Sequence, residues 1–178
     1  SSVSVKGGSV IAVLKIPCFR SIQKYYGYNY WTSEKYLDTQ ERLNRSLKES
    51  IRSGKIAKTE YMPSLIVPKS LSIPLIREAG ARLQADLVLI FGEQSNIFNE
   101  YRLFQSMKIR AYASCEYVLL DTRTGIILAS DVITEKIDTE KRKEDTSNDE
   151  AFLRAETDAL ESALRKLGTL VGDYIDAN

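Results

Sequence analysis

The sequence contains no histidine in its 178 residues. Histidine is the side chain that most often acts as a general base near neutral pH, and it is the commonest ligand of protein-bound metals. Without it, the Ser-His and Cys-His pairs of many hydrolases cannot form. We therefore expect a protein that is not an enzyme and that uses no metal and no other cofactor.

Cysteine is scarce as well, because the chain has only Cys18 and Cys115. Their separation fits neither a zinc-finger spacing nor a Cys-x-x-Cys spacing. Both lie on strand faces that we expect to point to the core, so two buried free thiols are the favoured interpretation. A disulfide is the alternative, and it would require neighbouring strands with Cα atoms within about 7 Å.

Long hydrophobic runs and an excess of one charge are also missing. No apolar run approaches the roughly 20 residues that a membrane-spanning helix needs. The 25 basic residues are balanced by 24 acidic residues, which leaves a net charge of +1. Because phosphate binding needs a concentrated cationic face, we do not expect nucleic acid to be the main partner.

The composition, 43% hydrophobic and 28% charged, is typical of one globular domain. Apolar residues recur every two positions in some segments and every three to four in others, which predicts strands and helices in the order β-α-β-α-β-β-β-α. We predict a single α/β domain over residues 9–178, with a mixed sheet of about five strands covered by three helices, and a flexible lead-in over residues 1–8. Strands are expected over 9–19, 55–61, 86–97, 107–119 and 126–137, and helices over 34–53, 72–83 and 149–175.

Three of these strands carry patterns that predict which face is buried. In the first strand the even positions are all apolar, whereas Lys15 interrupts the odd positions, so the even face is expected to point to the core. In the fourth strand the odd positions from 107 to 119 are apolar or aromatic, and most even positions are polar. In the fifth strand one face is expected to carry Ile127, Ala129, Ile133 and Ile137.

Small and polar residues mark the connections. Residues 121–125 read Asp-Thr-Arg-Thr-Gly, which predicts a hairpin turn with Asp121 as a turn former and Gly125 at a positive φ. Residues 138–148 are dense in charge and are expected to form a solvated, mobile loop. In the helices, Ala79 and Gly80 would allow close packing on the sheet, while Gly168 and Gly172 would weaken the last helix by about 1 kcal/mol each.

An aromatic segment between the first strand and the first helix is the main candidate for a binding site. Tyrosine and tryptophan combine a flat apolar ring with a polar group, which suits an interface or a sugar-stacking surface. The favoured interpretation is that the rings fold back over the end of the sheet, followed by a protein-partner surface and then by glycan or lipid contact. The residues are Tyr25, Tyr26, Tyr28, Tyr30 and Trp31.

Several carboxylates lie on or near the predicted strands, and a pair of them could in principle serve as acid and base. Nothing in their spacing requires such a pair, and strand glutamates are more often solvated or ion-paired. The candidates considered are Glu93, Glu100, Glu116, Asp121 and Asp131.

Two segments of the sequence resemble bacterial envelope lipoproteins. Residues 79–89 read AGARLQADLVL, residues 115–127 read CEYVLLDTRTGII, and a long helix closes the chain. The group includes the curli secretion lipoprotein, the lipoprotein activators of penicillin-binding proteins and the N-terminal domain of TolB. In that group a helix ending in a small-residue-Ala-Asp turn feeds a central strand, and a strand ending in Asp-x-x-Thr-Gly turns into its hairpin partner. The likeness covers residues 9–175 in the order of the elements.

The resemblance implies a periplasmic or outer-membrane-attached accessory domain that acts through contacts with an envelope protein. It also implies that any membrane attachment would come from a lipid anchor on a segment preceding Ser1. The alternative function is a glycan-binding or small-ligand-binding domain that uses residues 25–31.

Overall fold

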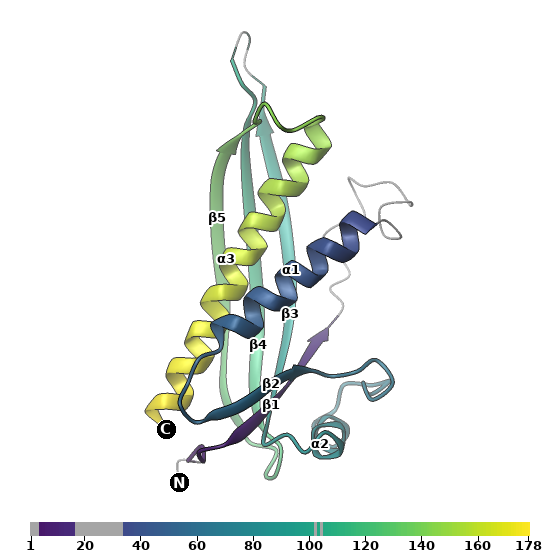
Figure 1. Cartoon of the computed structure of the whole chain (residues 1–178), viewed down its shortest axis with the longest axis vertical. Helices are drawn as coiled ribbons and strands as arrows, with labels where there is room; N and C mark the ends of the chain where they lie inside the picture. The colour runs from purple at the N-terminus through teal and green to yellow at the C-terminus, as the bar shows by residue number, and fades with distance from the viewer. Residues whose placement is uncertain (1–3, 17–33, 102, 104) are drawn as a thin grey trace.

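The computed structural model describes residues 4–16, 34–101, 103 and 105–178. Its elements follow the predicted order β-α-β-α-β-β-β-α, which confirms the fold class (Figure 1). They are β1 (Ser9–Ile16), α1 (Glu34–Ser50), β2 (Ile56–Tyr61), α2 (Ile73–Arg82), β3 (Leu87–Glu100), β4 (Lys108–Asp121), β5 (Ile127–Glu140) and α3 (Asn148–Ala177).

The strands form one mixed sheet in the order β2-β1-β3-β4-β5. Strand β1 is parallel to both β2 and β3, because α1 and α2 carry the chain back across the sheet. Strands β3, β4 and β5 are antiparallel, as short hairpin connections require. The predicted mixed sheet is therefore confirmed.

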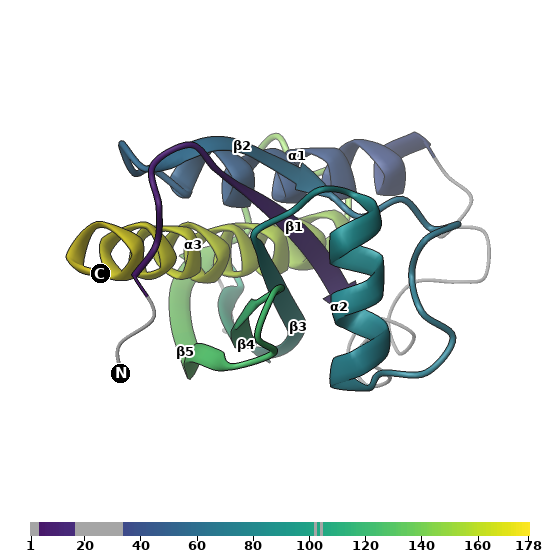
Figure 2. The same ribbon diagram turned by 90° about the horizontal axis from the view of Figure 1, so that it is seen from below.

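The helices divide unequally between the two faces of the sheet. Helices α1 and α3 lie side by side on one face, whereas α2 packs on the other face at one end only (Figure 2). The larger core lies under α1 and α3, and Val5, within the segment expected as a lead-in, is buried in it. The smaller core lies under α2 and includes Ala12, Leu14, Ile76, Ala79, Val88 and Leu120.

Strand β1 is buried on both faces. The even positions Ala12 and Leu14 lie in the smaller core, and the odd positions Ile11 and Val13 lie in the larger one. The prediction from the even face alone was thus incomplete, because α1 and α3 also cover the odd face despite its polar residues Ser9 and Lys15. For β4, the expected burial of the odd positions is confirmed from 107 to 119.

Strand β5 departs from the predicted pattern at its start. Leu120 pairs with Ile127 and Leu119 pairs with Ala129, so Leu128 is an extra residue in a bulge. The extra residue reverses the alternation of faces, and Ile127 is 50% exposed while Leu128 packs against the larger core. The prediction that Ile127 lies on the core face was therefore wrong.

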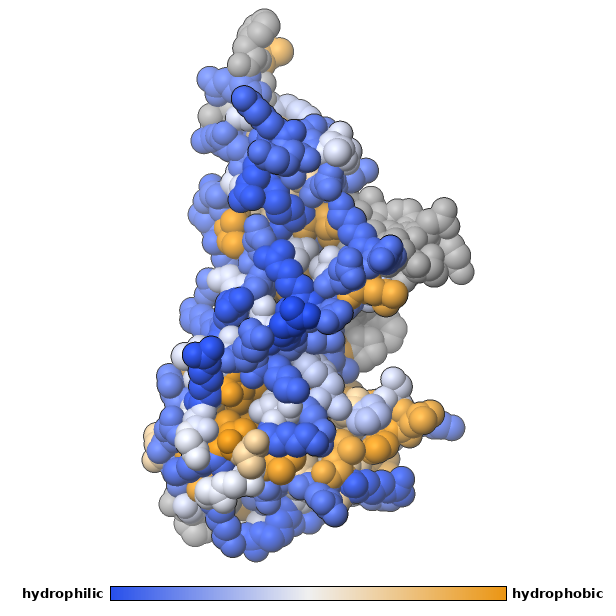
Figure 3. Space-filling model, viewed as in Figure 1, coloured by the Kyte–Doolittle hydropathy of each residue, from blue (hydrophilic) through white to orange (hydrophobic). Residues whose placement is uncertain are grey.

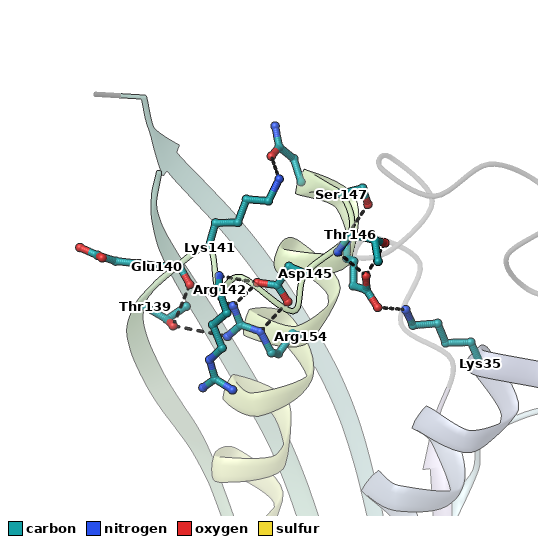
Figure 4. A network of polar contacts seen from close by, with 11 residues as sticks. Lys35, Thr139, Glu140, Lys141, Arg142, Asp145, Thr146, Ser147 and Arg154 are labelled. Carbon is teal, nitrogen blue, oxygen red and sulfur yellow. Dashed lines mark hydrogen bonds and ion pairs between the residues drawn. The ribbon is translucent and has the colours of Figure 1, made fainter. Parts of the chain in front are cut away.

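The predicted loop over 138–148 is also corrected. Residues 138–140 belong to β5, Asn148 is the first residue of α3, and residues 141–147 form a turn built around Asp145 (Figure 4). The carboxylate of Asp145 is buried and accepts hydrogen bonds from Arg154 Nη2 at 2.7 Å, Arg154 Nε at 3.0 Å and the backbone N–H of Arg142 at 2.7 Å. The bonds from Arg154 lower the pKa of Asp145 to about 2. The composition of residues 138–148 predicted a solvated loop because it does not reveal the partner of Asp145, Arg154, which lies outside this segment on α3.

Candidate functional site

Exposed aliphatic side chains gather at the end of the molecule where α2 packs. Figure 3 shows apolar surface over α2 and the segment before it, below a largely hydrophilic helical face. Leu65 is fully exposed, and the other members are between 40% and 52% exposed. We call this set the α2-end patch, and it consists of Leu65, Leu71, Ile73, Leu75, Ile126 and Ile127.

The start of α2 turns part of this patch outward. Ser72 has extended dihedral angles (φ −132°, ψ 148°), and its carbonyl accepts the N–H of Ile76 at 2.9 Å, so the first turn of the helix begins there. Pro74 fits this turn because its missing N–H would have had no partner within the helix. The inward stripe of α2 is occupied by Ile76, Ala79 and Gly80, and Leu75 lies beside this stripe. Ile73, in the first turn, is 44% exposed and Leu75 is 40% exposed.

The β4–β5 connection and the start of β5 supply Ile126 and Ile127 of the patch, and the connection is fixed to α2. Asp121 Oδ1 accepts hydrogen bonds from the N–H and the hydroxyl of Thr124, both at 2.6 Å, which confirms Asp121 as a turn former. Gly125 has the predicted positive φ, at 78°. A Cβ on Gly125 would lie 2.9 Å from Arg77 Cδ and 3.1 Å from Ile73 Cγ2, so α2 rests directly on this turn.

Arg77 and Gly80 join α2 to the turn through polar and apolar contacts. Arg77 Nε donates to the carbonyl of Thr122 at 2.9 Å, and Arg77 Nη2 donates to the carbonyl of Arg123. A Cβ on Gly80 would lie 2.7 Å from Val88 Cγ2 and 3.1 Å from Thr122 Cγ2. The close packing predicted from the small residues of α2 is thus confirmed, and it leaves the patch on a rigid support.

This junction contains one buried hydroxyl, that of Thr122, whose removal is expected to stabilise the protein. Thr122 Oγ1 is buried and has no hydrogen-bond partner in the described part of the chain. Replacing Thr122 with valine keeps the shape and removes the unmet polar group, so the free energy of unfolding is expected to rise by about 1 kcal/mol in a urea titration. The matched control is Thr124→Val, which deletes a bonded hydroxyl and should lower stability by about 1 kcal/mol. A loss of stability in Thr122→Val would contradict the expectation.

A groove of about 610 Å³ borders the patch. Its lining carries charges of both signs: the cations are Lys6, Arg77 and Arg123, and the anions are Glu78, Asp86 and Asp121. Asp86 already accepts the backbone N–H of Val10 at 2.8 Å, and Asp121 serves the turn, so these two carboxylates are structural. An apolar patch beside a mixed-charge border is the usual composition of a protein contact surface.

The candidate carboxylates do not converge. Glu93 faces α1 and α3, whereas Glu116 pairs with Gly92 and points to the opposite face of the sheet. Glu93 forms an ion pair with Lys15, and Asp131 accepts the N–H of its neighbour Val132 at 2.7 Å. Within the ranges that the structure describes, no three acidic or cysteine side chains are arranged as metal ligands would be.

Cys115 is a buried free cysteine, as the favoured interpretation predicted. Burial raises the pKa of its thiol to about 12, with a further contribution from Glu93, which lies directly opposite on β3. A thiol held in its neutral form is a poor nucleophile. Cys18 lies outside the described residues.

The aromatic candidates Tyr25, Tyr26, Tyr28, Tyr30 and Trp31 also lie outside the described residues. The α2-end patch was not among the binding sites predicted from the sequence. A signal was present for Leu75, which lies beside the inward stripe of α2 and cannot share it. In the described part of the chain, no helix has both the length and the apolar character needed to cross a membrane.

Comparison with known proteins identifies the fold but no family. No protein-family model and no curated protein matches the sequence. A solved hypothetical protein from Chlamydia trachomatis has a TM-score of 0.57 and 15% identity, with coverage of 97% of this chain and 100% of the other. A Helicobacter pylori protein, named as a homolog of the neuraminyllactose-binding hemagglutinin, has a TM-score of 0.54 and 13% identity, with coverage of 100% and 97%. A lipoprotein from Caulobacter crescentus has a TM-score of 0.49 and 9% identity, with coverage of 94% and 90%. At these identities the likeness concerns the fold alone.

Proposed function

We propose that the protein is a non-enzymatic accessory domain of the bacterial cell envelope that binds a protein partner through the α2-end patch. The observation that carries this proposal is the concentration of exposed aliphatic side chains on one rigidly supported end of the domain. Surface hydrophobic residues scattered singly need no explanation, but a contiguous group bordered by polar residues indicates an interaction site.

The sequence resemblance supports the envelope part of the proposal. Residues 79–89 and 115–127, the two segments that resemble envelope lipoproteins, meet in the structure, because the N–H of Thr122 donates to the carbonyl of Asp86 at 2.9 Å. Both segments also line the groove beside the patch. The location that follows is the periplasm or the periplasmic face of the outer membrane, with attachment through a lipidated segment.

The patch alone gives a moderate affinity. Full burial of a leucine or isoleucine side chain contributes about 1.5–3 kcal/mol, and most members of the patch are already half-buried. Burying the rest would contribute roughly 5–9 kcal/mol, which the loss of translational and rotational freedom largely offsets. The partner must therefore also contact the charged groove, or bind only transiently.

Site-specific photo-cross-linking tests this proposal. A photoreactive phenylalanine analogue at position 75 is expected to cross-link one partner in native membranes, whereas the same analogue at Leu37, which is 62% exposed on α1, should not. The double variant Leu71→Ser/Leu75→Ser should reduce capture of that partner about tenfold, equivalent to about 1.4 kcal/mol. The control Leu103→Ser removes a leucine that is 89% exposed and lies in the connection between β3 and β4, outside the patch. Equal capture by wild type and double variant would refute the proposal.

Residues 25–31 define the alternative function, a glycan-binding or small-ligand-binding domain. A double variant Tyr30→Ala/Trp31→Ala separates the two functions, because it should leave cross-linking at position 75 unchanged. The name of the Helicobacter pylori protein refers to neuraminyllactose binding, and this is the reason to include neuraminyllactose among the ligands tested.

A further inference from the structure

Among the described helices, none covers one face of the sheet over most of its length. Helices α1 and α3 cover the odd positions of β3 and β4, and α2 reaches only the end that holds Val88 and Leu120. The even positions of β3, β4 and β5 beyond that end face solvent. We call the central part of this surface the open face, and it consists of Gln94, Asn96, Phe98, Tyr112, Ser114 and Thr134.

The strand register places these side chains in rows. Gln94 pairs with Ser114, and Ser114 pairs with Thr134, so an amide and two hydroxyls form one row. The next row begins with Asn96 and Tyr112. Side chains in a row are about 4.8 Å apart across the strands, and successive rows are about 6.8 Å apart along them. The result is a fixed grid of hydrogen-bonding groups on a rigid sheet.

Most of these polar groups are unused by the protein itself. The side chains of Gln94, Ser114 and Thr134 make no hydrogen bond to another described residue. The Oδ1 atom of Asn96 accepts the N–H of Ile97 at 3.0 Å, which leaves its amide NH₂ group directed to solvent. These groups offer both donors and acceptors, and their positions are set before any ligand arrives.

Two aromatic rings lie beside this grid. Phe98 and Tyr112 pack edge to face, with ring centroids 5.8 Å apart and an angle of 87° between the ring planes. Phe98 is 55% exposed, so the pair presents apolar ring surface at the edge of the polar rows. A flat ring of this kind packs well against the C–H face of a sugar.

A shallow hollow of about 180 Å³ lies over the rows. Its volume equals that of about six water molecules at ~30 Å³ each, which is the scale of a single sugar ring. Every residue that lines it is uncharged: Gln94, Ser95, Asn96, Tyr112, Ala113, Ser114 and Thr134. The nearest charges on this face are Lys136, which lies opposite Tyr112, Arg110 and Glu116. Arg110 and Lys136 are both paired with Asp138.

We propose that the open face binds a neutral carbohydrate, with one sugar ring over the hollow and its C–H face against Tyr112. Amides and hydroxyls match the hydroxyl groups of a sugar, and the uncharged lining gives no advantage to an anion. A nucleic acid would need cations along its phosphates. A second copy of this sheet would need apolar side chains at the interface, as packed sheets have. The site shares no residue with the α2-end patch or with residues 25–31.

Two-dimensional NMR of the ¹⁵N-labelled protein tests this proposal. The probes are maltohexaose, chitohexaose and neuraminyllactose, each titrated to about 10 mM, a range that detects a Kd near 1 mM. At least one neutral probe is expected to shift the amide signals of Gln94, Asn96, Ser114 and Thr134. Tyr112→Ala and Gln94→Ala should each weaken that binding about fivefold to tenfold, whereas Leu37→Ala on α1 should leave it unchanged.

The remaining outcomes overturn the proposal. If none of the three sugars shifts signals on the open face, the face is not a carbohydrate site. If a sugar binds with equal affinity to Tyr112→Ala and Gln94→Ala, it binds elsewhere on the chain. Preference for neuraminyllactose over both neutral sugars would show that the ligand is an acidic sugar and not a neutral one. The variant Leu71→Ser/Leu75→Ser should bind sugar like wild type, so failure here is separable from failure of the protein-partner proposal.

Discussion

Replacing Gly172 with alanine is expected to lower the free energy of unfolding by about 2 kcal/mol, although alanine is the better helix former by about 1 kcal/mol. A Cβ at this position in α3 would lie 2.5 Å from the carbonyl oxygen of Arg52 and 3.1 Å from its backbone nitrogen. Backbone atoms cannot rotate away as a side chain can. Overpacking of this kind typically costs 1–3 kcal/mol, so the clash outweighs the gain in helix propensity.

Gly168 lies one turn earlier and meets the same neighbouring segment. Its Cβ would lie 2.6 Å from Ser50 Cβ and 3.0 Å from the carbonyl oxygen of Leu47. The two glycines thus form the surface of α3 on which the C-terminal end of α1 rests. Gly168→Ala should destabilise in the same direction, and the double variant by less than the sum, because one outward shift of residues 47–52 relieves both clashes.

Urea unfolding of the single variants and of Thr169→Ala gives the measurement. Thr169 is exposed on α3, and its hydroxyl bonds only the carbonyl of Arg165 within its own helix, so its substitution should change stability by less than about 0.5 kcal/mol. If Gly172→Ala were as stable as wild type or more stable, then α1 and α3 would lie farther apart than the structure places them.

The packing role of Gly168 and Gly172 could not be predicted from the sequence. Counted by helix propensity alone, Gly168 and Gly172 are only a weakness of α3. Their use depends on residues 47–52, which are more than 100 positions away in the sequence. No local pattern connects the two segments, and only the packing of α1 on α3 does so.

The parts that were predictable share one property: the pattern and its cause lie in the same segment. Alternation along β4 reports burial of one face, and Asp121 and Gly125 specify their own turn. The prediction for Ile127 in β5 was wrong because a bulge shifts the alternation of faces by one residue, and no sequence signal marks the bulge. The prediction of a solvated loop around Asp145 was wrong because the residue that binds its carboxylate, Arg154, is on α3.

The candidate binding surfaces also differ in how far the sequence could predict them. Composition predicted a binding site at residues 25–31, which lie outside the described residues. The absence of histidine excluded catalysis that depends on that side chain. Hydrophobicity alone did not identify the α2-end patch, because Leu75 resembles a core residue until the inward stripe of α2 is known. The polar even positions of β4 were visible in the sequence, but whether a described helix covers them depends on where α2 packs.

The second large effect is expected at the ion pair between Lys15 and Glu93. Replacing Lys15 with methionine should lower the free energy of unfolding by about 3 kcal/mol, because it leaves a buried carboxylate without its cation. The side chain of Glu93 is only 9% exposed, and that of Lys15 is 28% exposed. Lys15 Nζ also donates to Gln40 Oε1 on α1 at 2.9 Å, so the substitution removes this hydrogen bond as well.

Glu93 has little else to stabilise its charge. Its Oε2 atom is buried and has no hydrogen-bond partner within the described ranges. Burial raises the pKa of Tyr61 and of Cys115 nearby, and the negative charge of Glu93 raises both further. These shifts show that the surroundings of Glu93 are poorly solvated, which is the condition under which an unpaired charge is costly.

A double-mutant cycle separates the pair from its surroundings. Lys15→Met/Glu93→Leu removes both charges and fills the same space with apolar groups, so it should recover most of the stability lost in Lys15→Met. The control is Lys58→Met, since Lys58 is 61% exposed and pairs with Glu60 on the surface, where an ion pair contributes less than about 1 kcal/mol. If the double variant proved less stable than Lys15→Met alone, Glu93 would be stabilised by groups other than Lys15, and the argument that its charge depends on this one cation would fail.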